Sequence, residues 1–83
     1  MTKLMIVSIA SDHAGFELKE TIVSHLKALK IEVIDNGPKN DESVDYPDFA
    51  KKVVDDLKGS NANKGILICG SGQGMAMSAN KHT

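Results

Sequence analysis

The sequence predicts an α/β fold built on a parallel sheet of about three strands in the order 2-1-3, with helices on its flanks. Three apolar runs have the length of strands, namely Leu4–Ala10, Ile31–Ile34 and Gly65–Cys69. Segments with helical periodicity separate these runs, and a turn that contains glycine follows each of them. Alternation of strands and helices in this way is typical of doubly wound parallel sheets.

Hydrophobicity locates the first strand and the first helix. The run Leu4–Ala10 is almost continuously apolar, as expected for a strand that is covered on both faces. After the break at Ser11–Gly15, the helical spacing predicts one buried stripe, made of Ala14, Leu18, Ile22, Leu26 and Leu29. Four charged residues are expected on the opposite side of this helix: Lys19, Glu20, Lys27 and Lys30. Ser11 or Asp12 can cap its start.

The second half of the chain continues the alternation. Asp35–Pro38 predicts a turn after the second strand, and Pro47 suits the first position of a second helix. The buried stripe of that helix is expected to be Phe49, Ala50, Val53, Val54 and Leu57. Gly59–Asn61 ends this helix, and the third strand follows. After the glycines, the apolar residues of Met75–Ala79 predict the start of a third helix.

Composition limits the possible functions. The 83 residues fit one domain, and a net charge of −1 gives no electrostatic reason to expect nucleic acid or a membrane as a partner. A single cysteine excludes an internal disulfide framework and fits a cytoplasmic location. One cysteine without HxxH or CxxC spacing also predicts no metal site. Three parallel strands would leave two open edges, so we expect residues 1–83 to be a single truncated domain, or one that needs a partner.

Two unusual turns are expected to face one crevice. Ligands of open parallel sheets bind beyond the carboxyl ends of the strands, where the strand order reverses. Ser11–Gly15 and Cys69–Met75 both follow strands, and the order 2-1-3 makes those strands neighbours. The sequence therefore predicts a binding site between these two turns.

The glycine-rich turn matches no common nucleotide or hydrolase motif. Gly70–Gly74 is not GxGxxG because position 75 is Met, and no Gly-Lys-Ser/Thr follows for a Walker A loop. Ser71 is not in a GxSxG elbow, because position 69 is Cys. Backbone amides in such a turn can hold an anion at the start of a helix, and the alternative is a tight turn that needs glycine only for steric reasons.

Four further side chains have two interpretations each. A lone cysteine is often a small buried hydrophobic residue, but Cys69, beside a helix amino end, is also a plausible general base or nucleophile. Asp12 and His13 either cap the first helix or bind a hydroxylated ligand. Tyr46 either packs on the start of the second helix or lines the crevice.

Three stretches of the chain resemble the ribose-5-phosphate isomerase B family, which includes the galactose-6-phosphate isomerase subunits. They are ASDHAGFELKE after the first strand, VDYPDFA at the second helix and GILICGSGQGMAMSANK at the third strand. The resemblance implies a Rossmann-like α/β/α sandwich, here incomplete, and a homodimer or higher oligomer with sites at the interface. It also implies isomerisation of a sugar phosphate between aldose and ketose without a metal or other cofactor.

The resemblance also implies roles for individual residues. Cys69 would be the base that moves a proton between C1 and C2, and Asp12, His13 and Tyr46 would contact the sugar. Backbone donors for the enediolate would come from the turn Gly70, Ser71, Gly72, Gln73, Gly74 and Met75. Ser71 stands where Thr is commoner and keeps the hydroxyl. The residue types suit proton removal beside a carbonyl, which needs a base and a preorganised site for the oxyanion.

The sequence departs from the family pattern at one point, and two other functions remain open. Family members continue beyond SANK and supply a histidine and arginines there, whereas these 83 residues contain no arginine. We therefore expect the 83 residues alone to have little or no isomerase activity. One rival is a non-catalytic or split-isomerase interaction module that pairs with another chain. The other is a nucleotide-binding half in which Asp35 reads a ribose.

Overall fold

A computed structural model describes residues 5–38, 46–70 and 74–78 of the chain. The first part contains strand β1 (Ile6–Ser11), the short 3-10 helix η1 (His13–Gly15), helix α1 (Phe16–Ala28) and strand β2 (Glu32–Asp35). The second contains helix α2 (Tyr46–Lys58) and strand β3 (Lys64–Ile68), and strand β4 (Gly74–Ser78) follows. The three predicted strands and two of the three predicted helices are therefore present, with bounds that differ by a few residues.

The strands form one sheet in the order β2-β1-β3-β4. β1 lies in the centre and is parallel to both neighbours, with Ile9 opposite Asp35 on β2 and opposite Ile66 on β3. The predicted parallel core in the order 2-1-3 is confirmed. This order brings the carboxyl ends of β1 and β3 side by side.

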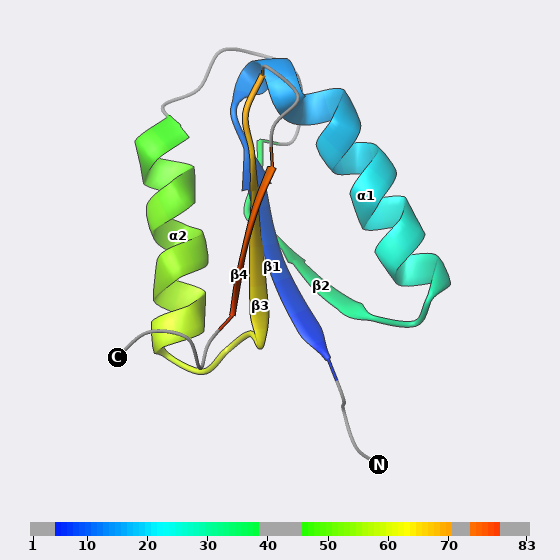
Figure 1. The fold of residues 1–83 in the computed structure, drawn as a ribbon, viewed down its shortest axis with the longest axis vertical. Helices are drawn as coiled ribbons and strands as arrows, with labels where there is room; N and C mark the ends of the chain where they lie inside the picture. The colour runs from blue at the N-terminus through cyan, green and yellow to red at the C-terminus, as the bar shows by residue number, and fades with distance from the viewer. Residues whose placement is uncertain (1–4, 39–45, 71–73, 79–83) are drawn as a thin grey trace.

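The two long helices cover opposite faces of the sheet (Figure 1). α1 packs against β1 and β2, whereas α2 packs against β1 and β3. Ile9, Val23 and Ile68 form the buried cluster on the α1 side, and Val53 is fully buried on α2. The predicted stripe of α2 is correct, because Val53 is buried and its other four members are half-buried.

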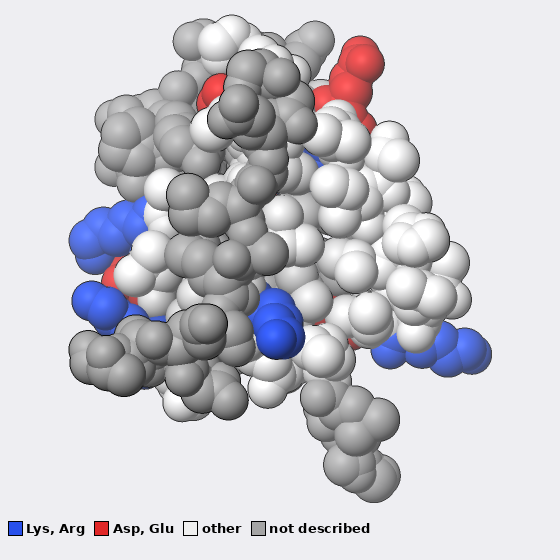
Figure 2. Space-filling view, in the orientation of Figure 1, with Lys and Arg blue, Asp and Glu red and all other residues white. Residues whose placement is uncertain are grey.

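The predicted stripe of α1 is wrong in part. Leu18 and Leu29 are 41% and 57% exposed, and Ala14 is exposed as well, whereas Lys19 is 0% exposed. The Lys19 ammonium donates to both carboxylate oxygens of Asp35, at 3.0 and 2.9 Å, and to Glu20 at 2.7 Å. A buried ammonium is tolerated when carboxylates surround it, and this pairing turns α1 away from the predicted orientation. In the view of Figure 2, uncharged residues cover much of the surface on the α1 side, with lysines at its margin.

A second polar cluster lies on the α2 side of the sheet. The Ser8 hydroxyl donates to the Asp56 carboxylate at 2.7 Å, and the Asn36 amide donates to Ser8 at 2.7 Å and to Asp56 at 3.0 Å. Ser8 is 0% exposed. These bonds connect β1, the end of β2 and α2.

The prediction of a third helix from Met75 onward is also wrong. Gly74–Ser78 is strand β4, antiparallel to β3, with Gly74 opposite Ile68 and Ser78 opposite Lys64. A helix of fewer than two turns is unfavourable because nucleation fixes several residues for few hydrogen bonds. Pairing with β3 instead satisfies the backbone groups along an edge that three parallel strands would leave open.

Candidate functional site

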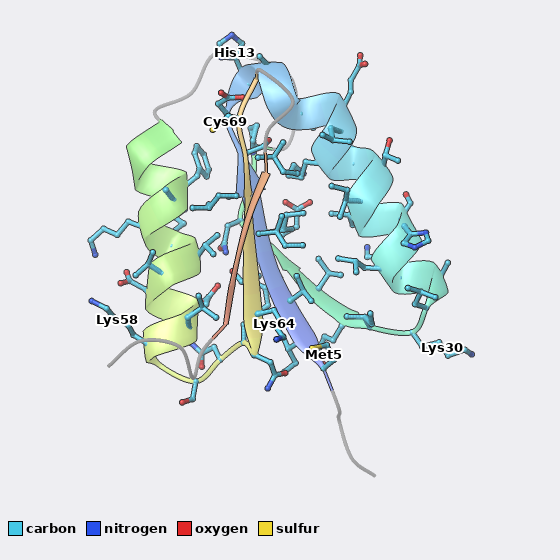
Figure 3. All side chains as sticks on the ribbon, in the orientation of Figure 1. Met5, His13, Lys30, Lys58, Lys64 and Cys69 are labelled. Carbon is cyan, nitrogen blue, oxygen red and sulfur yellow. The ribbon has the colours of Figure 1, made fainter. Side chains whose placement is uncertain are left out.

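The turns after β1 and β3 meet at one end of the sheet, as predicted. Ser11 and Ile68 are opposite each other in the register, and the Asp12 amide donates to the Ile68 carbonyl at 3.2 Å. His13 and Cys69 therefore lie at the same end of the molecule, whereas Met5 and Lys64 lie at the other (Figure 3). Chemistry-bearing residues of both turns are brought together by the pairing of β1 with β3.

The Asp12 carboxylate bridges the two turns. One oxygen, Oδ1, accepts the Gly15 amide at 2.8 Å and thereby caps the short helix η1. The other oxygen, Oδ2, accepts the Gly70 amide at 2.8 Å. Asp12 therefore caps η1, the 3-10 turn that leads into α1, whereas the N-cap residue of α1 itself is Gly15, which makes no side-chain cap bond. The Gly70 N–H is bound by a protein carboxylate in this structure.

Two glycines allow the turns to approach this closely. A Cβ atom on Gly70 would lie 2.4 Å from the Cβ of Ala14, and one on Gly15 would lie 3.0 Å from Cγ2 of Ile68. Atoms cannot pack at the first distance, so Gly70 is required by contact with the neighbouring turn. The sequence analysis missed Gly15, although its position three residues after a capping aspartate is a usable signal.

Cys69 is exposed at the end of β3, so the interpretation as a buried hydrophobic residue is wrong. The expectation that it lies beside the amino end of a helix is also wrong, because the next described element after the turn is strand β4. His13 is exposed in η1. Both side chains are therefore accessible to a ligand at this end of the sheet.

Several other predicted site residues lie outside the described residues. Ser71, Gly72 and Gln73 belong to this group, as does the side chain of Tyr46, whose backbone begins α2. The backbones of Gly74 and Met75 are described, and they pair with β3 opposite Ile68 and Leu67. The proposed backbone donors of this turn therefore remain predictions.

The end of β2 is held by a buried cation. The Asp35 carboxylate accepts both contacts from Lys19 and also the Gly37 amide at 3.0 Å. The Gly37 carbonyl in turn accepts the Ser11 amide at 3.1 Å, which connects the ends of β2 and β1. Asp35 thus has a structural partner at the position where the nucleotide-binding alternative needs a ribose contact.

Neither a metal-binding cluster nor a membrane-spanning helix is present in the described part of the chain. Residues 5–38, 46–70 and 74–78 contain no group of three or more His, Cys, Asp or Glu side chains arranged to hold a metal ion. No helix in these same ranges has the length and apolar character needed to cross a membrane.

The fold and the site define a class. A parallel 2-1-3 sheet with helices on both faces and polar turns at the carboxyl ends of its strands is a Rossmann-like α/β domain. The family described as Ribose/Galactose Isomerase matches residues 7–83. The chain belongs to this family.

Individual members of this family are similar to the chain over most of its length. A protein of Listeria innocua described as ribose-5-P isomerase B is 46% identical over 77 residues, which cover 93% of this chain and 52% of that protein. The crystal structure of a ribose 5-phosphate isomerase from Thermotoga maritima superposes with a TM-score of 0.79 at 51% identity, covering 82% of this chain and 47% of that one.

A further solved structure contains a ligand. The ribose-5-phosphate isomerase B of Mycoplasma genitalium, described with bound ribulose-5-phosphate, superposes with a TM-score of 0.67 at 48% identity. The match covers 77% of this chain and 43% of that one. The chain spans about half the length of the relatives it matches.

Proposed function

We propose that this chain forms part of a sugar-phosphate isomerase that interconverts ribose 5-phosphate and ribulose 5-phosphate, with Cys69 as the base. The observation that carries the proposal is the exposed Cys69 thiol, located where the Asp12–His13 turn meets the end of β3. Membership of the family supports the reaction class, and the description of the Mycoplasma genitalium structure supports the pentose phosphate as ligand.

The proposed reaction moves one proton between two carbons. The Cys69 thiolate takes the proton from C2 of the aldose, the released electron pair forms the C1–C2 double bond, and the π electrons of the C1 carbonyl move to O1, which becomes the oxyanion of an enediolate. The Cys69 thiol, whose proton exchanges with solvent, then protonates C1, and a hydroxyl proton moves from O2 to O1, which gives the ketose. Ser71 and the amides of its turn would stabilise the enediolate oxygen, because donors aimed at developing charge lower the barrier.

The remaining contacts concern the substrate and the assembly. The exposed His13 imidazole would contact sugar hydroxyls, together with Tyr46 at the start of α2, as the family resemblance implies. We propose a homodimer or higher oligomer in the cytoplasm, supported by the family resemblance and by the single cysteine. Mass measurement in solution tests the assembly, and a monomer at every concentration would contradict it.

The decisive experiment measures proton transfer by the polypeptide made from its natural reading frame. With ribose 5-phosphate in deuterated water, we expect ribulose 5-phosphate to form and deuterium to enter the carbon-bound positions of the sugar. Cys69→Ala should reduce turnover by about 10²–10⁴-fold, the usual contribution of a general base. Undiminished turnover by Cys69→Ala would contradict the assignment of the base, and absence of turnover by the unmodified protein would contradict the proposed function.

A further inference from the structure

Asp12 forms hydrogen bonds to the backbone on both sides of Cys69. Its amide donates to the carbonyl of Ile68, the residue before the cysteine, at 3.2 Å. Its carboxylate accepts the amide of Gly70, the residue after the cysteine, at 2.8 Å. One residue of the first turn therefore fixes the two peptide groups that flank the thiol.

The orientation of the Asp12 carboxylate is itself fixed. Its second oxygen accepts the Gly15 amide at 2.8 Å, and the Asp12 carbonyl accepts the Ser11 hydroxyl at 2.9 Å. Hydrogen bonds to an ionised carboxylate are stronger than bonds between neutral groups. The close approach of Gly70 to Ala14 leaves no room for a side chain at Gly70, so it depends on the same two turns lying together.

We propose that Asp12 is the positioning residue for the Cys69 thiol, acting through the Gly70 peptide. This inference rests on the proposed function, in which Cys69 must reach a carbon-bound proton. A base that is displaced by about 1 Å can lose about 10²-fold in rate, so the bridge has a direct catalytic consequence. Each oxygen of the Asp12 carboxylate accepts one backbone amide, so the carboxylate holds the two turns in place.

The test measures the reactivity of Cys69, which is the only cysteine in the sequence. Alkylation by iodoacetamide without substrate measures how freely the Cys69 side chain is presented. Asp12→Asn is nearly isosteric, but its amide has one acceptor oxygen for the two N–H groups of Gly15 and Gly70. The thiol is already exposed, so we expect alkylation to become faster by up to about tenfold because a turn that has lost one hydrogen bond to a charged group lets the thiol adopt more orientations toward the reagent. In turnover assays, kcat should fall while KM changes little.

A steric pair provides a second, independent perturbation. Gly70→Ala inserts a methyl group against the Cβ of Ala14 and should separate the turns, with the same effects on alkylation and kcat as Asp12→Asn. Gly70 does not adopt a positive φ, so the alanine itself introduces no backbone strain. Adding Ala14→Gly removes the clash and should restore both readouts. This rescue keeps the test decisive if Asp12→Asn fails to fold.

Asp56→Asn is the matched control. Like Asp12, the Asp56 carboxylate accepts two hydrogen bonds. They come from the side chains of Ser8 and Asn36, and Asp56 lies on α2, away from the residues beside Cys69. Its variant should lose stability and still alkylate within about twofold of the unmodified protein, since Asp56 makes no hydrogen bond to the residues beside the thiol. An equal acceleration in Asp12→Asn and Asp56→Asn, or none in either, would overturn the proposal. Because alkylation needs no substrate, this result stays readable even if no isomerisation is found.

Discussion

Two neighbouring residues at the end of β2 point to opposite faces of the sheet, and each belongs to a different kind of polar cluster. Asp35 meets the buried ammonium of Lys19 on the α1 side, whereas Asn36 joins the Ser8 hydroxyl and the Asp56 carboxylate on the α2 side. The first cluster is held by ion pairs around a buried cation. The second is held by hydrogen bonds from neutral donors to a carboxylate.

The difference explains why one helix follows its hydrophobic pattern and the other does not. On α2 the polar member Asp56 lies beside the apolar stripe, and the buried position is taken by Val53. On α1 the buried position is taken by Lys19, while Leu18 and Leu29 are exposed. A buried charge is costly unless it is paired, so the position of Asp35 determines which side of α1 faces the sheet.

Of the substitutions that test this comparison, Lys19→Ala should cause the largest loss in the free energy of unfolding. It leaves Asp35 without its cation and opens a space where a fully buried side chain stood, so we expect a loss of about 3–5 kcal/mol in the free energy of unfolding. Urea denaturation followed by circular dichroism measures the change. Lys19→Met fills most of the space and should cost less, because it removes the charge without leaving a cavity. Equal losses for the two variants would show that the charge dominates over packing.

Ser8→Ala tests the neutral cluster and should have an intermediate effect. The variant removes one hydrogen bond to Asp56 and one from Asn36, but the Asn36 amide keeps its direct bond to Asp56 at 3.0 Å. We expect a loss of about 1 kcal/mol in the same denaturation experiment, because the remaining polar groups keep a partner. A loss as large as that of Lys19→Ala would contradict the distinction between the two clusters.

Lys51→Ala should have the smallest effect. Lys51 pairs with Asp55 at 3.1 Å along α2, but the two side chains are 73% and 56% exposed. Water and salt screen such pairs, so we expect a change below about 0.5 kcal/mol that diminishes further at high salt. A larger loss that persists at high salt would mean that exposure does not separate this pair from that of Lys19.

The sequence was sufficient to predict the parallel core and the location of the site. Apolar runs of strand length placed β1, β2 and β3, and their alternation with helices implied the order in which they pair. The order alone brings Asp12 and His13 to the same end of the sheet as Cys69. These features depend on local patterns and on general rules of topology, which one sequence contains.

Other features depend on pairings between distant residues. The partnership of Lys19 with Asp35 spans 16 positions, and that of Asp12 with Gly70 spans 58, so no periodicity reveals either. The strand β4 shows the same limit, because Met75–Ala79 has a helical composition and only the open edge of β3 favours an extended chain.

The central position of β1 also affects the order in which the chain can fold. β1 precedes both of its neighbours in the chain, and the second of them ends at Ile68, so the sheet cannot close around β1 until β3 has left the ribosome. Parallel pairing between distant segments is slow to form. The nascent chain therefore leaves one edge of β1, the central strand, unpaired until β3 has emerged.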